Sequence, residues 1–191
     1  MIQSLNKRAE QDLSYIRAAM HRAEGVSTVS GWGIVAMGVV GLIAGVVAQS
    51  QADPHAALTV WLMAAPLAAS IGAITSILKT QRAKRSLLAD PIWRFTCCLV
   101  PTLIAAALLT VPLWQSAPEL LPAVWMLLYG CGVAAAGTYA VRPIVLMGGG
   151  FILAGAVALA TPTTAHHLLL TSTFGGLHIA FGWQVARAHG G

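Results

Sequence analysis

The chain contains few charged residues. Asp, Glu, Lys and Arg make up 9% of its 191 residues, whereas 57% of the residues are hydrophobic. An ordinary soluble domain is about 25% charged, so a water-facing surface over most of the molecule is not expected. The length allows one compact bundle and leaves no room for a separate soluble domain of useful size.

Groups that could carry out catalysis are also scarce. No Asp, Glu, Lys or Arg lies in the interior of the long apolar segments, where such charges are kept when ions or protons must move. The motifs of zinc proteases, P-loop proteins and serine hydrolases are missing. The sequence therefore predicts neither a proton-coupled pump nor an enzyme, and it offers no catalytic residue, metal site or cofactor site of recognisable pattern.

The three cysteines do not form a disulfide framework. Cys97, Cys98 and Cys131 lie inside apolar segments, and adjacent cysteines do not make a C-x-x-C motif. Cys97 and Cys98 also lie near the expected cytoplasmic end of their segment, so we expect reduced thiols.

Six apolar segments dominate the chain. Each has about the 20 residues that a helix needs to cross roughly 30 Å of hydrocarbon. They are residues 31–50, 56–78, 93–115, 121–140, 143–160 and 165–186. The expected fold is all-α: a polytopic membrane bundle of six transmembrane helices over residues 28–191, preceded by a cytoplasmic amphipathic helix in residues 1–27.

All eleven Lys and Arg residues lie on one side of this pattern. They precede the first segment, lie between the second and third, separate the fourth from the fifth, and follow the sixth. Cytoplasmic loops hold the excess of Lys and Arg, so we expect both termini in the cytoplasm. The net charge of +5 then belongs to membrane flanks, and no nucleic-acid partner is expected.

Residues 2–24 have the pattern of an amphipathic helix. Apolar residues recur at steps of three and four from Ile2 to Ala23, while Lys7 and Glu10 lie on the other side. The simplest interpretation is a helix lying along the inner leaflet of the lipid bilayer. The alternative is a docking surface for a cytoplasmic protein partner.

The six tryptophans are sorted to the ends of the segments. They are Trp32, Trp93 and Trp183 at the expected inner ends, and Trp61, Trp114 and Trp125 at or near the expected outer ends. This distribution is typical of the aromatic belts at the two membrane interfaces.

The first and fifth segments share part of their sequence. Residues 34–48 and 144–158 are identical at eight of fifteen positions, at an offset of 110. Both segments would run from inside to outside, so a true repeat would be parallel and would divide the bundle into three hairpins. Coincidence explains the match equally well, because membrane spans use few residue types.

His178 is a polar residue near the middle of the apolar sixth segment, and its position there requires an explanation. Gly175 and Gly176 precede it and would let a neighbouring helix approach closely. A buried imidazole needs a hydrogen-bond partner, and we expect Tyr129 or Thr138 of the fourth segment to provide it. The alternatives are a ligand site formed by His178, Gly175, Gly176 and Tyr129, or a single-haem or metal-bearing subunit with His178 as the ligand.

A second group of polar residues should gather at the outer surface. It comprises His55, His166 and His167 with Asp53 and Glu119. We expect solvated loop residues here. A zinc or copper site is the alternative if the loops converge, because imidazole and carboxylate suit both metals.

Several short motifs recur along the chain. They are Tyr15-Ile16-Arg17 with Met20, Arg22 and Ala23, Gly31-Trp32-Gly33, Met37-Gly38, Leu128-Tyr129-Gly130 with Gly132, Val141-Arg142, Met147-Gly148 and the segment 174–182. Together they resemble a group of small bacterial six-span inner-membrane proteins with no established activity. Members of that group have a proline before Gly-Trp-Gly, where this chain has Ser30. The resemblance implies an inner-membrane location and, through a loose association with winged-helix regulators, a regulatory or stress role.

The function expected from these features is that of a non-enzymatic binding, regulatory or accessory membrane component. A facilitative transporter or small channel is the alternative, because the glycine run at 148–150 and the matching Gly38 and Gly41 resemble interrupted helices. Small residues four apart, such as Gly41 and Gly45, pack helices closely within one bundle or between copies, so a homo-oligomer is a further expectation.

Overall fold

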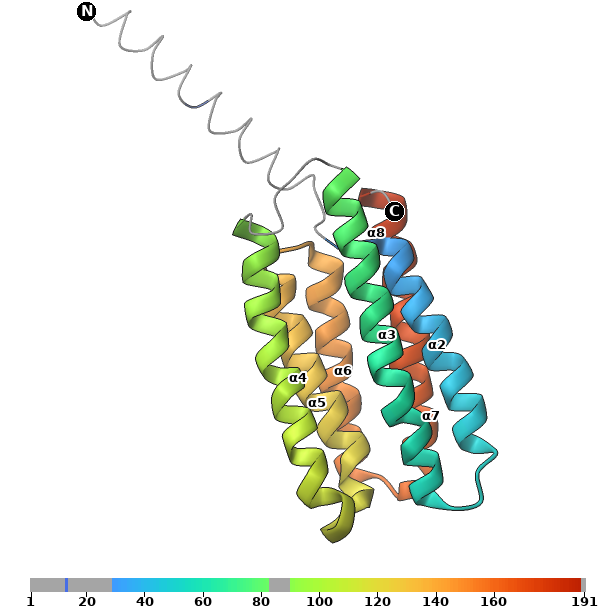
Figure 1. Cartoon of the computed structure of the whole chain (residues 1–191). Coiled ribbons are helices and arrows are strands. Elements are labelled where there is room, and N and C mark those ends of the chain that lie inside the picture. Colours follow the sequence, from blue (N-terminus) through green and yellow to red (C-terminus); the bar gives the residue numbers. More distant parts are fainter. Residues whose placement is uncertain (1–12, 14–28, 83–89, 190–191) are drawn as a thin grey trace, which may run out of the picture.

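A computed structural model describes residue 13, residues 29–82 and residues 90–189, and this part of the chain is helical apart from short connections (Figure 1). The long helices are α2 (Gly31–Gln49), α3 (Pro54–Arg82), α4 (Asp90–Ser116), α5 (Leu121–Gly137) and α6 (Arg142–Ala160). A broken helix follows, composed of α7 (His166–Leu170), the π-helical segment η3 (Thr171–Leu177) and α8 (His178–His189). The amphipathic helix predicted for residues 2–24 lies, apart from Leu13, outside the described residues.

These helices coincide with the six predicted apolar segments, to within four residues at each end. Five of the described helices are long and apolar enough to cross a membrane. The broken helix differs from these five in that the π-helical segment divides it into two shorter α-helical pieces. The all-α fold and the character of a multi-pass membrane protein are therefore present in the described part of the chain.

Local sequence explains where several helices begin. The hydroxyl of Ser30 accepts a hydrogen bond from the Gly33 N–H at 3.2 Å, as a helix N-cap does. Asp53 caps α3 in the same way through the Ala56 N–H at 3.2 Å. Pro143 lies in the first turn of α6, where its missing N–H costs no intrahelical bond. Ser30 thus has a structural role at the start of α2.

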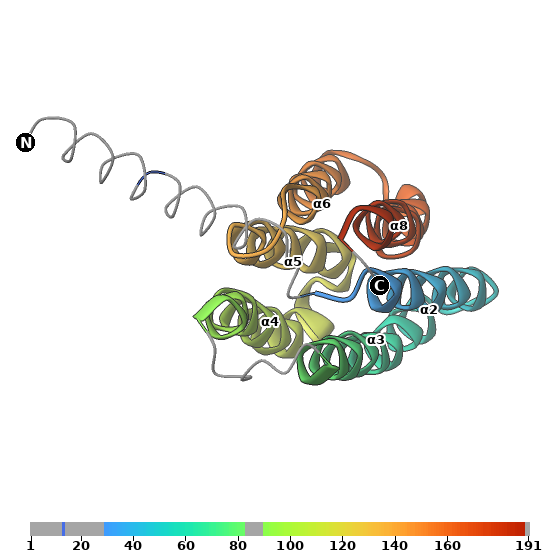
Figure 2. The same cartoon turned by 90° about the horizontal axis from the view of Figure 1, so that it is seen from above.

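The described helices form two units of three. The α2 unit consists of α2, α3 and the broken helix, with α2 packed against both of the others; the α5 unit consists of α4, α5 and α6, with α5 in the same central role. Figure 2 shows the units side by side. Contacts between the units are lighter and come mainly from α5 and α6 against the broken helix. This grouping differs from three equal hairpins, because α6 packs tightly on α5 and only lightly on α8.

Glycines allow the closest helix contacts within each unit. A Cβ on Gly38 of α2 would lie 2.8 Å from the Gly175 carbonyl, and one on Gly148 of α6 would clash with the backbone of Ala134 in α5. Gly38 and Gly148 are equivalent positions in the repeated sequence pattern. Their shared role in close packing accounts for this part of the sequence match without requiring a repeated fold.

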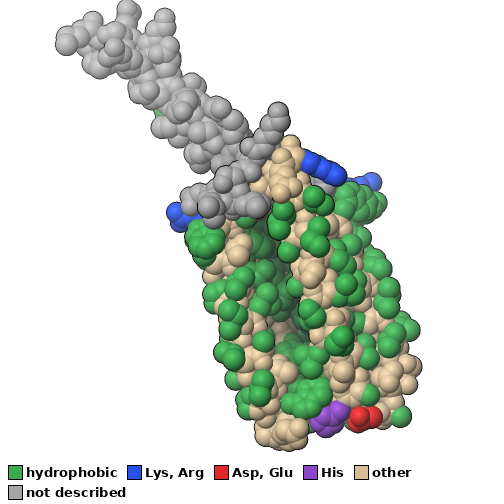
Figure 3. All heavy atoms as spheres, in the orientation of Figure 1, with side chains coloured by type: hydrophobic (Ala, Val, Ile, Leu, Met, Phe, Trp, Pro, Cys, Tyr) green, Lys and Arg blue, Asp and Glu red, His purple; other side chains and the backbone are tan. Residues whose placement is uncertain are grey.

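Apolar side chains cover the outside of the bundle. Only 6% of the most apolar stretch of α4 is buried inside the protein, against 50% of the most apolar stretch of residues 118–137, which include α5. The side chains of Met63 and Val111 are 70% and 73% exposed. Figure 3 shows hydrophobic side chains between two polar ends, with a furrow between α4 and α3. An outward apolar surface of this kind suits a lipid environment.

The two ends of the bundle differ in charge. The basic end carries Lys79 and Arg82 at the end of α3, Arg142 at the start of α6 and Arg187 near the end of α8. The acidic end, so named from its two described carboxylates, carries Asp53 before α3 and Glu119 in the turn before α5.

The tryptophans follow the predicted sorting only in part. Trp32 and Trp183 are exposed at the basic end, where their rings meet edge to face at 5.4 Å. Trp61 instead is only 6% exposed and packs against Phe174 inside the bundle. Its expected role as an outer-belt residue facing lipid is therefore wrong, because its ring fills the contact between α3 and the π-helical segment.

Candidate functional site

His178 lies at the junction between the π-helical segment and α8, and it is only 2% exposed. Its Nε2 lies 2.7 Å from the hydroxyl of Tyr129 on α5. The expected hydrogen bond between the sixth and fourth segments is thus confirmed, with Tyr129 as the partner. Thr138 bonds the Ala135 carbonyl of its own helix instead. Since α8 and α5 belong to different units, this bond crosses the interface between the units.

The surroundings of the ring favour one tautomer. The backbone of Thr173 and Phe174 lies close to the His178 side chain, and Nε2 is occupied by Tyr129, but Nδ1 forms no hydrogen bond of good geometry within the described part of the chain. A proton on Nδ1 leaves Nε2 free to accept the Tyr129 O–H. The pair can then be satisfied without a charge. A metal or haem iron on Nε2 would have to displace Tyr129.

The two rings that form this hydrogen bond pack with two phenylalanine rings in a single cluster, here called the aromatic cluster. It consists of Tyr129, Phe151, Phe174 and His178, and all six pairs have ring centroids between 4.8 and 6.1 Å apart. Trp61 extends it from α3, with its ring 5.9 Å from that of Phe174. Edge-to-face and offset pairs each contribute about 0.5–1.5 kcal/mol beyond burial. The cluster therefore joins the two units at mid-height.

The π-helical segment brings His178 to this position. One extra residue per turn widens the helix there, and such segments are frequent at functional sites. Thr173 Oγ1 bonds the carbonyls of Leu169 and Leu170 at 2.7 and 3.2 Å. The carbonyls of Phe174 and Gly175 face glycines of α2 at close range. Hydroxyl and Cα–H contacts of this kind compensate for irregular backbone bonding away from water.

The two glycines predicted to accompany His178 have different surroundings. Gly175 is buried, and a Cβ there would clash with Leu42 of α2. Gly176 is exposed, and a Cβ there would meet nothing within 4 Å. Gly175 therefore has a packing role against α2, whereas Gly176 has no such role.

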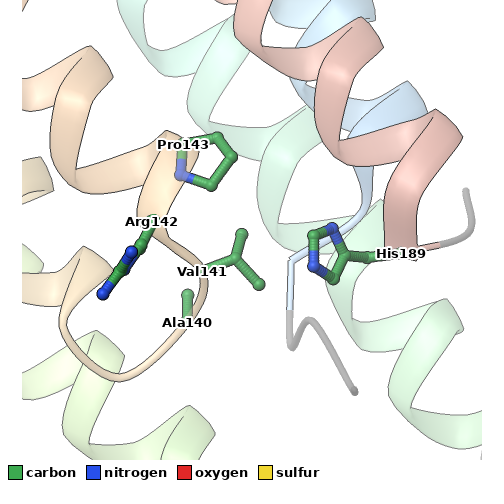
Figure 4. A pocket seen from close by; sticks show the side chains of 5 residues that line it. All are labelled: Ala140, Val141, Arg142, Pro143 and His189. Carbon is green, nitrogen blue, oxygen red and sulfur yellow. The ribbon is translucent and has the colours of Figure 1, made fainter. Parts of the chain in front are cut away.

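A hollow of about 480 Å³ lies at the basic end. It is lined by Ala140, Val141, Arg142 and Pro143 from the turn between α5 and α6, and by His189 from the end of α8 (Figure 4). The hollow thus lies between the two units. This hollow could not be predicted from the sequence, because no local pattern indicates that the last turn of α8 lies beside the turn before α6.

At the acidic end, hydrogen bonds and a ring contact connect the two units. The Nε2 of His55 in α3 lies 3.3 Å from the Trp114 carbonyl of α4, and the two rings pack at 5.3 Å. His166 lies 2.9 Å from the Ala158 carbonyl of α6. Among the described side chains, no three His, Cys, Asp or Glu residues converge as metal ligands. His55 and His166 thus have separate structural partners, whereas the buried Nδ1 of His167 has no hydrogen-bond partner among the described residues.

Comparison of the chain with protein-family models, with curated protein sequences and with solved structures gave no match. The resemblance to the bacterial six-span group therefore remains a prediction.

Proposed function

We propose that the chain is a bacterial inner-membrane protein that acts as a non-enzymatic binding or regulatory component through movement of its two units. In this proposal all six helices cross the bilayer, because the broken helix runs over 24 residues, from 166 to 189, which is long enough to span. The basic end faces the cytoplasm, with both termini on that side.

The observation that carries the proposal is the Tyr129–His178 bond between the units. Each unit is tightly packed inside, while the contacts between the units are lighter. At mid-height they consist of this hydrogen bond and the aromatic cluster, and at the acidic end of the hydrogen bonds of His55 and His166. Rigid groups of helices that meet at such an interface can shift as bodies. A ligand or partner that favours one arrangement then changes the population of both.

Distance measurement between spin labels would test this movement. Labels at Leu67 of α3 and Leu108 of α4, which are 56% and 67% exposed, report the separation of the units in a variant whose native cysteines are replaced. In the parent protein we expect one main distance between the two labels. In Tyr129→Phe we expect a second group of molecules with a different distance. Tyr139→Phe, at an exposed tyrosine near the end of α5, is the matched control. One unchanged distance in all three proteins would contradict moving units.

The second function that an observation favours is facilitative transport. His55 with Trp114 and His166 with Ala158 connect the units at the acidic end, whereas a hollow separates residues of the two units at the basic end. A carrier open toward one side has this asymmetry. Solute uptake into liposomes that exceeds the rate of protein-free liposomes would support transport over regulation.

Partners of the proposed component are a cytoplasmic protein, bound through residues 2–24, and a second copy of the chain. Affinity capture of membrane extracts with the whole chain and with a chain lacking residues 1–24 tests the first. A partner retained equally by both chains would exclude docking through the N-terminal segment.

A further inference from the structure

Two exposed tryptophans meet at the basic end of the α2 unit. Gly31, in the first turn of α2, packs so closely on α8 that a Cβ on the glycine would clash with the backbone of Ala186. The start of α2 and the last turns of α8 therefore lie side by side (Figure 2). The rings of Trp32 and Trp183 meet there edge to face, with centroids 5.4 Å apart. Both side chains remain exposed, so this aromatic pair forms part of the outer surface.

An arginine adds a charge to the aromatic pair. Arg187 lies one helical turn after Trp183 and is exposed, and its guanidinium carbon is 5.1 Å from the centre of the Trp183 ring. A guanidinium over an indole face is attracted by the ring, which restrains an otherwise flexible side chain. The ring occupies one face of the guanidinium, so the N–H groups along its edge can bind another acceptor. Trp32, Trp183 and Arg187 are here called the tryptophan–arginine cluster.

The charge around this cluster is positive. The Lys79 ammonium group donates a hydrogen bond to the His189 carbonyl at 3.3 Å, and it thereby offsets the negative C-terminal end of α8. Asp53 and Glu119, the two carboxylates with described side chains, lie at the opposite end of the bundle. Neither of them competes with an external anion for Arg187.

An apolar stripe continues from the cluster along α2. Val39 and Ile43 follow Trp32 at steps of seven and four residues, so they share its face of the helix, and both are exposed. The eleven residues from Trp32 to Ile43 rise ~16 Å in an α-helix, which is close to one leaflet, half of the roughly 30 Å of hydrocarbon in a bilayer. The cluster and the stripe therefore match the order of groups in a phospholipid, with a charged headgroup above an acyl chain.

We propose that the tryptophan–arginine cluster binds an anionic phospholipid of the membrane. Arg187 contacts the phosphate oxygens through its N–H groups. The rings of Trp32 and Trp183 contact the glycerol region, where indole rings prefer to lie, and the stripe of Val39 and Ile43 contacts one acyl chain. The site lies on α2 and α8 of a single unit. It therefore goes beyond the proposed function, since it requires a membrane around the bundle but no movement between the units.

Native mass spectrometry of the full chain, released from an uncharged detergent, tests the site with two lipids. Dioleoyl phosphatidylglycerol has a net negative charge, whereas dioleoyl phosphatidylcholine has the same acyl chains and no net charge. We expect the first phosphatidylglycerol to bind with a Kd about fivefold or more below that of phosphatidylcholine, the preference that one basic residue gives for an anionic headgroup.

Three variants locate the binding. Arg187→Gln should remove the preference for phosphatidylglycerol. Trp183→Leu keeps every charge and should also weaken phosphatidylglycerol binding, because the guanidinium loses the ring that restrains it. Arg82→Gln is the matched control: it removes the same charge from an exposed arginine at the same end of the bundle, which is outside the cluster. We expect less than a twofold change in Kd for this control, since an exposed charge away from the lipid is largely screened.

Three results would overturn the site. The first is an equal affinity of the parent chain for the two lipids. The second is an equal loss in Arg187→Gln and Arg82→Gln, which would indicate general attraction to a basic surface. The third is displacement of the lipid by excess glycerol 3-phosphate, which would indicate a soluble phosphate ligand. The spin-label distances bear on the movement of the units alone, so the lipid site and the proposed function can fail separately.

Discussion

The hydroxyl of Tyr129 lies 2.7 Å from Nε2 of His178, and this hydrogen bond joins two separately packed groups of three helices. Both rings also pack against Phe151, which is fully buried. Polar and aromatic contacts thus coincide at one point of the interface. Hydrogen bonds between membrane helices are worth only about 0.6–2 kcal/mol, so this bond alone does not hold the two groups in one arrangement.

A double-mutant cycle should show that Tyr129 and His178 act as one pair. Tyr129→Phe and His178→Leu should each lower the free energy of unfolding in detergent by about 0.6–2 kcal/mol. The double variant should lose less than the sum, because the second change removes a bond already broken. His178→Gln keeps a donor and an acceptor and should lose less than His178→Leu. Additive losses would mean that the two side chains stabilise the fold independently.

Neighbouring glycines of α6 should respond in opposite ways to alanine. Gly148→Ala puts a methyl group against the Ala134 backbone and should destabilise by about 1–3 kcal/mol, as overpacking does. Gly149 is exposed, and a Cβ there meets nothing within 4 Å. Gly149→Ala should therefore stabilise by up to about 1 kcal/mol through better helix propensity. Thermal unfolding of both variants measures this, and similar shifts would exclude the close α5–α6 contact at Gly148.

Much of the fold could be predicted because uninterrupted apolar length and flanking charge are local properties. The helix from Gly31 to Gln49, for example, begins at a serine cap and ends where polar residues resume. The partner of His178 was also predictable, since a buried imidazole needs a hydrogen bond and the fourth segment offers few hydroxyl groups.

The remaining features depend on packing between distant segments. Trp61 resembles a belt residue in the sequence, yet it is buried and its ring lies against that of Phe174 in the π-helical segment. That segment in turn depends on carbonyl contacts with Gly38 and Gly41 of α2. No local pattern distinguishes such a contact from an ordinary helix containing glycine, so the broken helix was predicted as a continuous one.

The π-helical segment should tolerate the loss of one residue. A π turn contains about one residue more than an α turn, so deleting exposed Gly176 lets the segment become α-helical while its two flanks keep their positions. Deleting Ala180 from α8 instead rotates the rest of that helix by about 100°. It would displace Gly182 from its contact with Val35. We expect a folded protein after the first deletion and a large loss of stability after the second. An equal loss of stability after both deletions would contradict the idea that the π-helical segment contains one extra residue.

The N-terminal segment should depend on its apolar side. Ile16→Glu or Met20→Glu places a charge on the side that gains free energy from burial, at about 25 cal/mol per Å². Limited proteolysis from the cytoplasmic side should then cut residues 2–24 faster. Lys7→Gln changes the polar side and should leave the rate unchanged. Equal protection in all three variants would exclude an amphipathic anchor.

The orientation of the bundle should follow its basic end. Reporter fusions at residues 53 and 118, in connections at the acidic end, should appear outside the cytoplasm, and a fusion after Arg187 should appear inside. Lys and Arg in short loops resist translocation in proportion to their number. Replacing the four Lys and Arg residues of segment 79–85 together should therefore produce molecules of reversed orientation, whereas replacing one of them should not. A fusion at 53 that is cytoplasmic in the parent chain, or one after Arg187 that is exported, would contradict six spans with cytoplasmic termini.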